Sequence, residues 1–235
     1  MTDMDMQHPG LLHRLLARIY GFINSCSFKN SSDYWEKRYA HGGTSGAGSY
    51  GKLAEFKAEI INGVIHRHSI HTVVEFGCGD GNQLGLLDRG VSYLGLDVSA
   101  TAVAHCQQKF GDDVRKRFAV YDGRLDLDPA LGIKAELSMS IDVIFHLVED
   151  AVFIQYMQNL FSAADRHVLI YSTNRPYGAA RHLPHVRHRN FSDYVAAAFP
   201  AWKLHEHVVS RYPSTQHQDG SDAEFFLYTR TAQEY

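Results

Sequence analysis

Two spacings of hydrophobic residues alternate along most of this chain, and they predict strands and helices in turn. Short apolar runs predict strands at 72–76, 92–97, 117–121, 136–141 and 167–172. Apolar residues at helical spacing predict helices near 82–88, 100–110 and 150–164. Such alternation is typical of a parallel sheet with helices on both faces. The predicted fold class is therefore α/β, with a Rossmann-like doubly wound sheet.

The flanking segments extend this pattern at both ends. A helix is expected over 53–68, another near 192–199, and two strands at about 202–210 and 223–230 form a hairpin-like pair. Residues 11–19 read as a short amphipathic helix. That helix could contact a second copy in a homodimer, rest on a membrane surface or dock on its own domain. We divide the chain into N-terminal helices with a lid (1–69) and a core (70–235).

A glycine-rich turn follows the first of the alternating strands. The run from Val73 to Gly81 reads V-V-E-F-G-C-G-D-G, and Asp97 ends the next apolar strand. Glycines let a backbone approach a ligand closely, and a carboxylate at the second strand tip can accept hydrogen bonds from both ribose hydroxyls. These features predict a pocket for a cofactor that carries a nucleoside.

The spacing within this turn argues against a dinucleotide. The pattern G-x-G-x-x-G is not met, because the third glycine, Gly81, comes one residue early. Glu75 would repel a pyrophosphate, but it could anchor the ammonium of an amino-acid moiety. S-adenosylmethionine combines an amino acid with adenosine and has no phosphate, so it is the predicted cofactor.

Four segments in order resemble motifs of the class I S-adenosylmethionine-dependent methyltransferases. They are E-F-G-C-G-D-G, G-L-D-V-S, Y-D-G at 121–123, and S-M-S-I-D-V-I-F-H at 138–146. The resemblance covers roughly 70–175 and implies strand order 3-2-1-4-5-7-6 with strand 7 antiparallel. Its implied cofactor contacts are Gly77, Cys78, Gly79 and Gly81 at the methionine part, Asp97 and Val98 at the nucleoside, Asp122 and Gly123 at the adenine edge, and Ser140 and Ile141 under the sulfonium. Asp97 could instead stabilise a helix N-terminus, and Asp122 could be a turn residue.

An aromatic segment followed by a glycine- and serine-rich loop precedes the core. We interpret 33–51 as a lid in which Tyr34, Trp35, Arg38 and Tyr50 enclose the cofactor and Arg38 meets its carboxylate. The alternative is a surface helix whose aromatic side chains fix it to the core. The strings Y-W-E-x-R-Y and G-x-S-G-x-G-S-Y-G also resemble bacterial methyltransferases of glycan synthesis, which adds Ser49 to the expected functional positions.

His146 is the candidate general base, since it lies just past the fourth strand, where the sulfonium is expected. Asp142, four residues earlier, could orient His146 or shape the pocket. His146 could also pack locally without acting as a base. Asp142, Glu149 and Asp150 could hold Mg²⁺, but an acidic pair at a helix start more often complements the helix dipole. We therefore predict no metal.

A loop at about 174–191 is the expected acceptor-binding segment. Its arginines and histidines suit an anionic or polyhydroxylated acceptor such as a sugar, although they could equally form a solvated loop. A zinc site from His182, His185 and His188 lacks cysteines and a confirmed helical register.

Composition limits the partners and the cellular compartment that we expect for this protein. The chain has 235 residues, a net charge of −3 and no long basic run, which disfavours nucleic acid as a partner. Three cysteines without metal-type spacing fit a reducing cytoplasm, and no apolar run is long enough to cross a membrane.

The sequence therefore predicts an S-adenosylmethionine-dependent O-methyltransferase for a sugar or glycan-related hydroxyl. Two alternatives stay open: a small-molecule N- or O-methyltransferase of natural products, and a cofactor-binding regulatory protein without activity.

Overall fold

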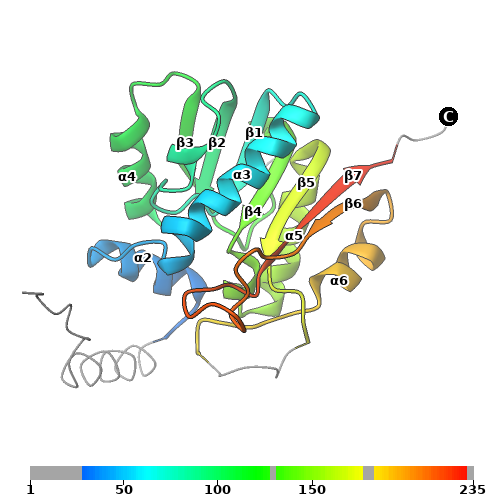
Figure 1. The fold of residues 1–235 in the computed structure, drawn as a ribbon. Coiled ribbons are helices and arrows are strands. Elements are labelled where there is room, and N and C mark those ends of the chain that lie inside the picture. Colours follow the sequence, from blue (N-terminus) through cyan, green and yellow to red (C-terminus); the bar gives the residue numbers. More distant parts are fainter. Residues whose placement is uncertain (1–27, 128–130, 177–182, 232–235) are drawn as a thin grey trace, which may run out of the picture.

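The computed structural model describes residues 28–127, 131–176 and 183–231. They form a seven-stranded sheet in the order β3-β2-β1-β4-β5-β7-β6 (Figure 1). Strands β1 to β5 are parallel, and β7 is antiparallel to both β5 and β6. The predicted fold class, strand order and antiparallel strand are confirmed. The strands are β1 (Thr72–Phe76), β2 (Ser92–Asp97), β3 (Lys116–Val120), β4 (Ala135–Ile141), β5 (Ala164–Ser172), β6 (Trp202–Val208) and β7 (Glu224–Arg230).

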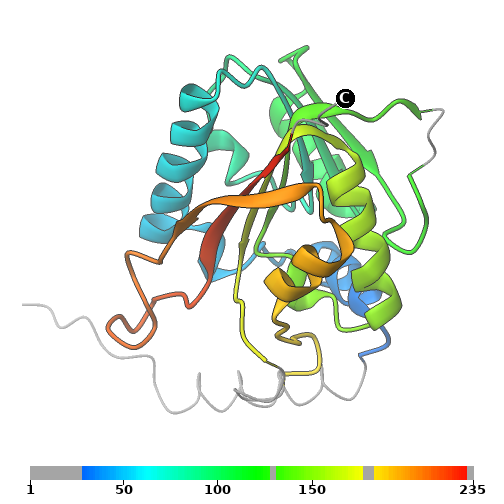
Figure 2. The ribbon, with the colours of Figure 1, turned by 90° about the vertical axis from the view of Figure 1, so that its right-hand side faces the viewer.

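Helices cover both faces of this sheet. Figure 2 shows α3 on one side of the sheet and α5 and α6 on the other. The helices are α2 (Ser31–Ala40), α3 (Gly51–Arg67), α4 (Ala100–Phe110), α5 (Asp150–Ser162) and α6 (Phe191–Ala198). Short 3₁₀ turns are η1 (Ala47–Ser49), η2 (Leu84–Leu86) and η4 (Ile144–His146).

Side chains along each strand point alternately to the two faces of the sheet, and a hydrophobic core lies on each face. Val73 faces a core shared with Phe56 and Ile61 of α3, and the next residue, Val74, faces a core shared with Met157 of α5. Successive side chains of a strand point to opposite faces, so one apolar run supplies both cores. The sheet is thereby fixed between its helices, and the strand ends are held in place.

One predicted helix is wrong, because its segment does not form an α-helix. The segment near 82–88 forms only the 3₁₀ turn η2. Asn62 of α3 donates from Nδ2 to the Leu86 carbonyl at 3.1 Å and accepts from the Asp88 amide at 2.8 Å. These tertiary bonds occupy backbone groups that a longer helix would use, and Gly85 lowers the helix propensity.

The strand order reverses between β1 and β4. Strands β2 and β3 extend from one side of β1, whereas β4 and β5 lie on the other. Ligands of open α/β sheets bind beyond the carboxyl ends of strands at such a point. Over the described ranges, the helices are too short or too polar to span a bilayer.

Candidate active site

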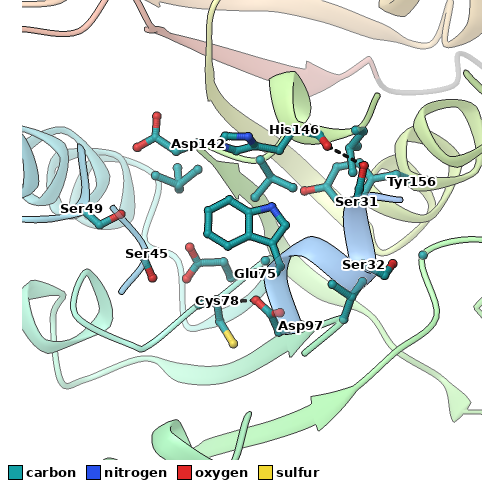
Figure 3. Close-up of a pocket in the computed structure, with 18 of the residues that line it drawn as sticks. Ser31, Ser32, Ser45, Ser49, Glu75, Cys78, Asp97, Asp142, His146 and Tyr156 are labelled. Atoms are coloured by element: carbon teal, nitrogen blue, oxygen red, sulfur yellow. Dashed lines mark hydrogen bonds between the residues drawn. The ribbon is translucent and has the colours of Figure 1, made fainter. Parts of the chain in front are cut away.

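A cleft of about 870 Å³, counted with its open mouth, lies at this point of reversal. Gly77 after β1, Asp97 at the end of β2 and Ile141 at the end of β4 contribute to its wall. Figure 3 shows side chains that line it.

The glycine-rich turn is shaped by packing against neighbouring segments. Gly77 and Gly79 have φ angles of 84° and 56°, in the left-handed region. A Cβ at Gly77 would collide with Val143, and one at Gly79 would collide with Ser45. The glycines therefore admit the β4 loop and the lid, where the sequence predicted that they admit the ligand.

The amides of the turn are already hydrogen-bonded within the protein. Those of Gly77 and Cys78 donate to the Leu96 carbonyl at 2.7 and 3.1 Å, and Gly79 donates to Asp97 Oδ2 at 2.9 Å. The amides of residues 80–82 donate to Ser45 Oγ, the Cys78 carbonyl and Asp80 Oδ1. A phosphate-binding turn needs free N–H groups. This turn offers none between residues 77 and 82.

Two buried carboxyl groups instead give the cleft an acidic wall. Glu75 is 3% exposed and accepts a hydrogen bond from the Tyr93 hydroxyl, and burial raises its pKa to about 7. Asp97 is 5% exposed, and burial raises its pKa to about 6 although the amides of Ser99 and Gly79 donate to it. Both groups favour a ligand that is cationic or rich in hydrogen-bond donors.

An unpaired oxygen in the same wall supports this preference. Gln83 donates from Nε2 to the Ala54 carbonyl at 3.1 Å. Its buried Oε1 has no hydrogen-bond partner among the residues that the structure describes. A buried acceptor without a partner is costly, so a donor on a bound ligand would stabilise this site. The residues therefore fit the ammonium and ribose hydroxyls of S-adenosylmethionine.

Helix α2 and the loop after it cover the glycine turn. Trp35, Tyr39, Ser45 and Ser49 line the cleft from this side. The Ser45 amide donates to Asp80 Oδ2 at 2.9 Å, which joins the loop to the turn.

Two carboxylates hold helix α2 against the rest of the protein. Glu36 accepts from the hydroxyls of Ser99 and Thr101, at 2.7 and 2.5 Å, at the start of α4. Glu149 accepts from Ser31 at the start of α2, from the amide at 3.0 Å and from the hydroxyl at 2.7 Å.

His146 lines the cleft in a defined tautomer. Its Nδ1 lies 2.9 Å from the His185 carbonyl oxygen. Because a carbonyl only accepts, Nδ1 carries the proton and Nε2 keeps its lone pair. Burial lowers the His146 pKa to about 4, so the ring is neutral. The Trp35 ring meets it edge-on at a centroid distance of 4.9 Å.

Asp142 also lines the cleft, but its partner is Lys57. Lys57 Nζ donates to Asp142 Oδ2 at 2.5 Å, and the Lys57 side chain is 1% exposed. The prediction that Asp142 orients His146 is therefore corrected, since the His185 carbonyl fills that role. Asp142 follows β4 with a φ of 59°, so it turns away from the strand direction.

Predicted residues divide between the cleft wall and its surroundings. Besides those already placed, Cys78, Val98 and Gly123 lie on the wall. Tyr34, Arg38 and Tyr50 do not. Tyr34 stacks on His185 at 4.3 Å, Arg38 Nε donates to the Thr44 carbonyl at 2.6 Å, and the Tyr50 hydroxyl donates to Asp80 at 2.7 Å. These side chains hold the lid rather than form the wall.

Gly81, Asp122 and Ser140 also lie off the wall. A Cβ at Gly81 would collide with α4, so this glycine serves packing. Asp122 pairs with Arg124 at 2.6 Å. Ser140 accepts from the Tyr156 hydroxyl at 2.7 Å, because strand alternation turns it away from the face of Ile141.

The described arginines of the loop after β5 form hydrogen bonds and ion pairs within the protein. Arg189 donates to the Leu147 and Val148 carbonyls and to Asp150, and Arg187 donates to the Val148 carbonyl at 3.0 Å. Arg175 pairs with Asp222 at 3.3 Å. Arg175, Arg187 and Arg189 thus bond to the protein itself, Arg181 lies outside the described residues, and the binding of an anionic or polyhydroxylated acceptor by this loop stays a prediction.

The described residues contain no group of three or more His, Cys, Asp or Glu side chains that could hold a metal ion. Of the histidines considered for zinc, His182 lies outside the described residues, as do the predicted helix 11–19 and positions 177–182 of the acceptor loop.

Sequence reasoning missed several wall residues, above all Lys57. Ala54, Lys57, Ala58 and Ile61 are all buried, at the spacing of one helix face. A lysine on an apolar helix face was the available signal. The other missed wall residues include Tyr39, Ser45, Asp80, Gln83, Tyr121, Val143 and Tyr156.

No protein-family model matches the sequence, and no curated protein matches it significantly. Solved structures do match. The N-methyltransferase NodS from Bradyrhizobium japonicum, in complex with S-adenosylhomocysteine, superimposes with a TM-score of 0.69 at 14% identity, over 87% of this chain and 100% of that one. Magnesium protoporphyrin IX methyltransferase from Synechocystis, with bound S-adenosylhomocysteine, gives 0.61 at 16% identity, over 85% and 98%.

The methyltransferase domain of the bacterial protein CtHen1 gives a TM-score of 0.61 at 17% identity, over 77% of this chain and 100% of that domain. Together with the strand order, these similarities show that the chain has the class I S-adenosylmethionine-dependent methyltransferase fold.

Proposed function

We propose that this protein is an S-adenosylmethionine-dependent methyltransferase that methylates a hydroxyl of a sugar or glycan-related acceptor. The observation that carries the cofactor assignment is the polarity of the cleft. Its turn amides are occupied, while Glu75, Asp97 and Gln83 Oε1 offer hydrogen-bond acceptors. Such a wall suits a cationic amino acid and a ribose, and it disfavours a pyrophosphate.

Each half of the cofactor has residues that would hold it. Asp97 would accept from the ribose hydroxyls, as carboxylates at this strand tip do in nucleotide-binding sheets. Glu75 and Gln83 would face the ammonium, and Val98 with Tyr121 would pack on the adenine. Bound S-adenosylmethionine supplies a methyl group already activated on sulfur, so alignment of the acceptor is the main task of the protein.

His146 supports an oxygen acceptor. A hydroxyl is a weak nucleophile and gains from a base that takes its proton. In the tautomer fixed by the His185 carbonyl, Nε2 keeps a lone pair that would accept that proton. The pKa of about 4 keeps the ring neutral near pH 7 but makes it a weaker base than an ordinary imidazole, so proton removal would have to accompany methyl transfer rather than precede it. Trp35 of the lid covers one side of the ring through its edge-on contact.

A second candidate, N-methylation of a small molecule, is favoured by the similarity to the N-methyltransferase NodS. An amine attacks the methyl group through its own lone pair, so this reaction depends less on the basicity of His146 than methylation of a hydroxyl does. The acidic wall would also tolerate a cationic amine.

Calorimetric titration with S-adenosylhomocysteine tests the cofactor assignment, with ATP and NAD as competitors. We expect one site of micromolar affinity that neither nucleotide displaces. Transfer from methyl-labelled cofactor is then measured on saccharides, amines and phenols. Transfer to saccharides supports the proposal, transfer only to amines or phenols supports the second candidate, and binding without any transfer supports a regulatory protein.

A further inference from the structure

A buried ion pair joins helix α3 to the end of strand β4 inside the cleft. Lys57 and Asp142 are 85 positions apart, and both line the cleft wall. Lys57 is almost fully buried, whereas the Asp142 side chain is 18% exposed. Burial of a charged pair costs desolvation that its attraction does not reliably offset. A pair of this kind at a ligand site therefore calls for a functional explanation.

One oxygen of Asp142 is left for a ligand. Lys57 takes Oδ2, and Oδ1 has no hydrogen-bond partner among the described residues. In Figure 3, Asp142 lies toward His146, while Cys78 and Asp97 lie on the opposite side of the cleft. The Asp142 side chain therefore lies at the His146 end of the cleft, away from the expected ribose site.

The backbone of Asp142 is held in an uncommon conformation. Its φ of 59° lies in the left-handed region, which non-glycine residues seldom adopt. The Asp142 amide donates to the Tyr171 carbonyl at 2.9 Å, so the bond to β5 and the bond to Lys57 hold this conformation together. Residues in such conformations concentrate at functional sites.

From these observations, and resting on the proposed methyl transfer, we propose that Lys57 is a positioning residue. It holds the Asp142 carboxylate in the acceptor end of the cleft. There, Oδ1 accepts a hydrogen bond from a hydroxyl adjacent to the one that His146 deprotonates. The acceptor class that fits is a molecule with two neighbouring hydroxyl groups, as in a sugar.

Three variants separate this role from a merely structural one. Asp142→Asn keeps the side-chain shape and tolerates the left-handed backbone. Lys57→Met removes the charge and keeps most of the length. The double variant removes both charges, so it leaves no unpaired buried ion and is expected to regain the melting temperature that Lys57→Met loses. Arg211→Met, in an exposed pair with Glu59, is the control.

The readouts are the melting temperature, the affinity for S-adenosylhomocysteine and transfer to methyl glycosides and their monodeoxy analogues. All variants should keep cofactor affinity within about threefold. Asp142→Asn and the double variant should lose about 10- to 100-fold in kcat/KM. Removal of the neighbouring hydroxyl from the glycoside should cost the natural protein as much, and it should cost Asp142→Asn almost nothing.

Specific results would overturn the role of Lys57. A double variant with full transfer would make the pair structural. A loss of more than about 30-fold in cofactor affinity for Lys57→Met would make Lys57 a cofactor ligand. A crystal structure of Lys57→Met with S-adenosylhomocysteine should show the Asp142 carboxylate turned from its present position, and an unmoved carboxylate contradicts the proposal even if no glycoside is methylated. Absence of any heat with S-adenosylhomocysteine would instead refute the proposed function itself.

Discussion

The two ends of the cleft are built over very different distances in the sequence. At the cofactor end, Gly79 reaches Asp97 and Glu75 reaches Tyr93, each across 18 positions. At the acceptor end, Lys57 reaches Asp142 across 85 positions and Ser31 reaches Glu149 across 118. The cofactor end is formed by strand β1, the glycine turn and strand β2. The acceptor end joins α2, α3 and the loops after β4 and β5.

This difference separates cofactor binding, which is the general function, from acceptor recognition, which is the particular one. The bonds that build the cofactor end lie within β1, the glycine turn and β2, so this end depends less on distant elements, although Val143 and Ser45 pack against the turn. The acceptor end depends on elements that pack together only in the folded chain, and packed contacts are sensitive to small changes. Acceptor specificity is therefore expected to reside in the long-range contacts.

The largest expected effect falls at the acceptor end, on His146. His146→Asn keeps a donor for the His185 carbonyl but has no nitrogen at the Nε2 position. We expect kcat to fall about 1000-fold, since removal of a general base typically costs two to four orders of magnitude. Affinity for S-adenosylhomocysteine, followed by calorimetry, should change by less than about threefold.

His146→Gln is the matched comparison, because it places an amide near Nε2 without a basic nitrogen. It should be as slow as His146→Asn. Equal losses of turnover and cofactor affinity in both variants would make His146 a binding residue and remove the proposed division between the two ends.

At the cofactor end, Asp97→Asn should show the reverse pattern. The amide would lose the charge-assisted hydrogen bonds to the ribose, and we expect S-adenosylhomocysteine to bind about 100-fold more weakly. At saturating cofactor, kcat should stay within a few-fold of the natural protein. Undiminished affinity would show that the adenosine half binds elsewhere.

A smaller effect is expected of pH on cofactor affinity. S-adenosylhomocysteine should bind about tenfold or more weakly at pH 5.5 than at pH 8. Burial raises the pKa of Glu75 to about 7 and that of Asp97 to about 6. A cationic, donor-rich ligand prefers the ionised carboxylates, so affinity is present above pH 7 and is lost as the pH falls through 7 and 6.

Binding near pH 6.5 must then release protons. Calorimetry in two buffers of different ionisation enthalpy measures this release directly. Glu75→Gln should bind more weakly, and its remaining pH dependence should lie near pH 6. A flat profile for the natural protein would contradict the assignment of these groups to the cofactor.

The smallest expected effect tests the anchoring of the lid. Glu36 holds α2 to the start of α4, and the bonds from Thr101 and Ser99 lower its pKa. Glu36→Gln weakens these bonds, and we expect about a fivefold loss of cofactor affinity through faster dissociation. The exposed Glu55→Gln is the control and should bind normally. Equal dissociation rates, measured by stopped flow, would mean that α2 does not retain the ligand.

Much of the fold followed from local pattern, but the lid side chains did not. The central strands β1, β4 and β5 are largely buried on both faces, so an apolar run identified each of them. Tyr34, Trp35 and Arg38 share one helical turn, and the sequence placed all three at the cofactor. Only Trp35 lines the cleft, because the other two contact His185 and Thr44. Which face of α2 turns inward depends on partners that are distant in the sequence.

The sequence by itself determined the alternation of strands and helices, the glycine turn and the carboxylate at the next strand tip, because each depends on residues close together in the chain. Tertiary structure alone decided that Lys57 meets Asp142 and that the His185 carbonyl fixes the His146 tautomer. Hydrogen bonds and ion pairs act over a few ångströms, so their partners are set by how distant segments pack and not by their order in the chain.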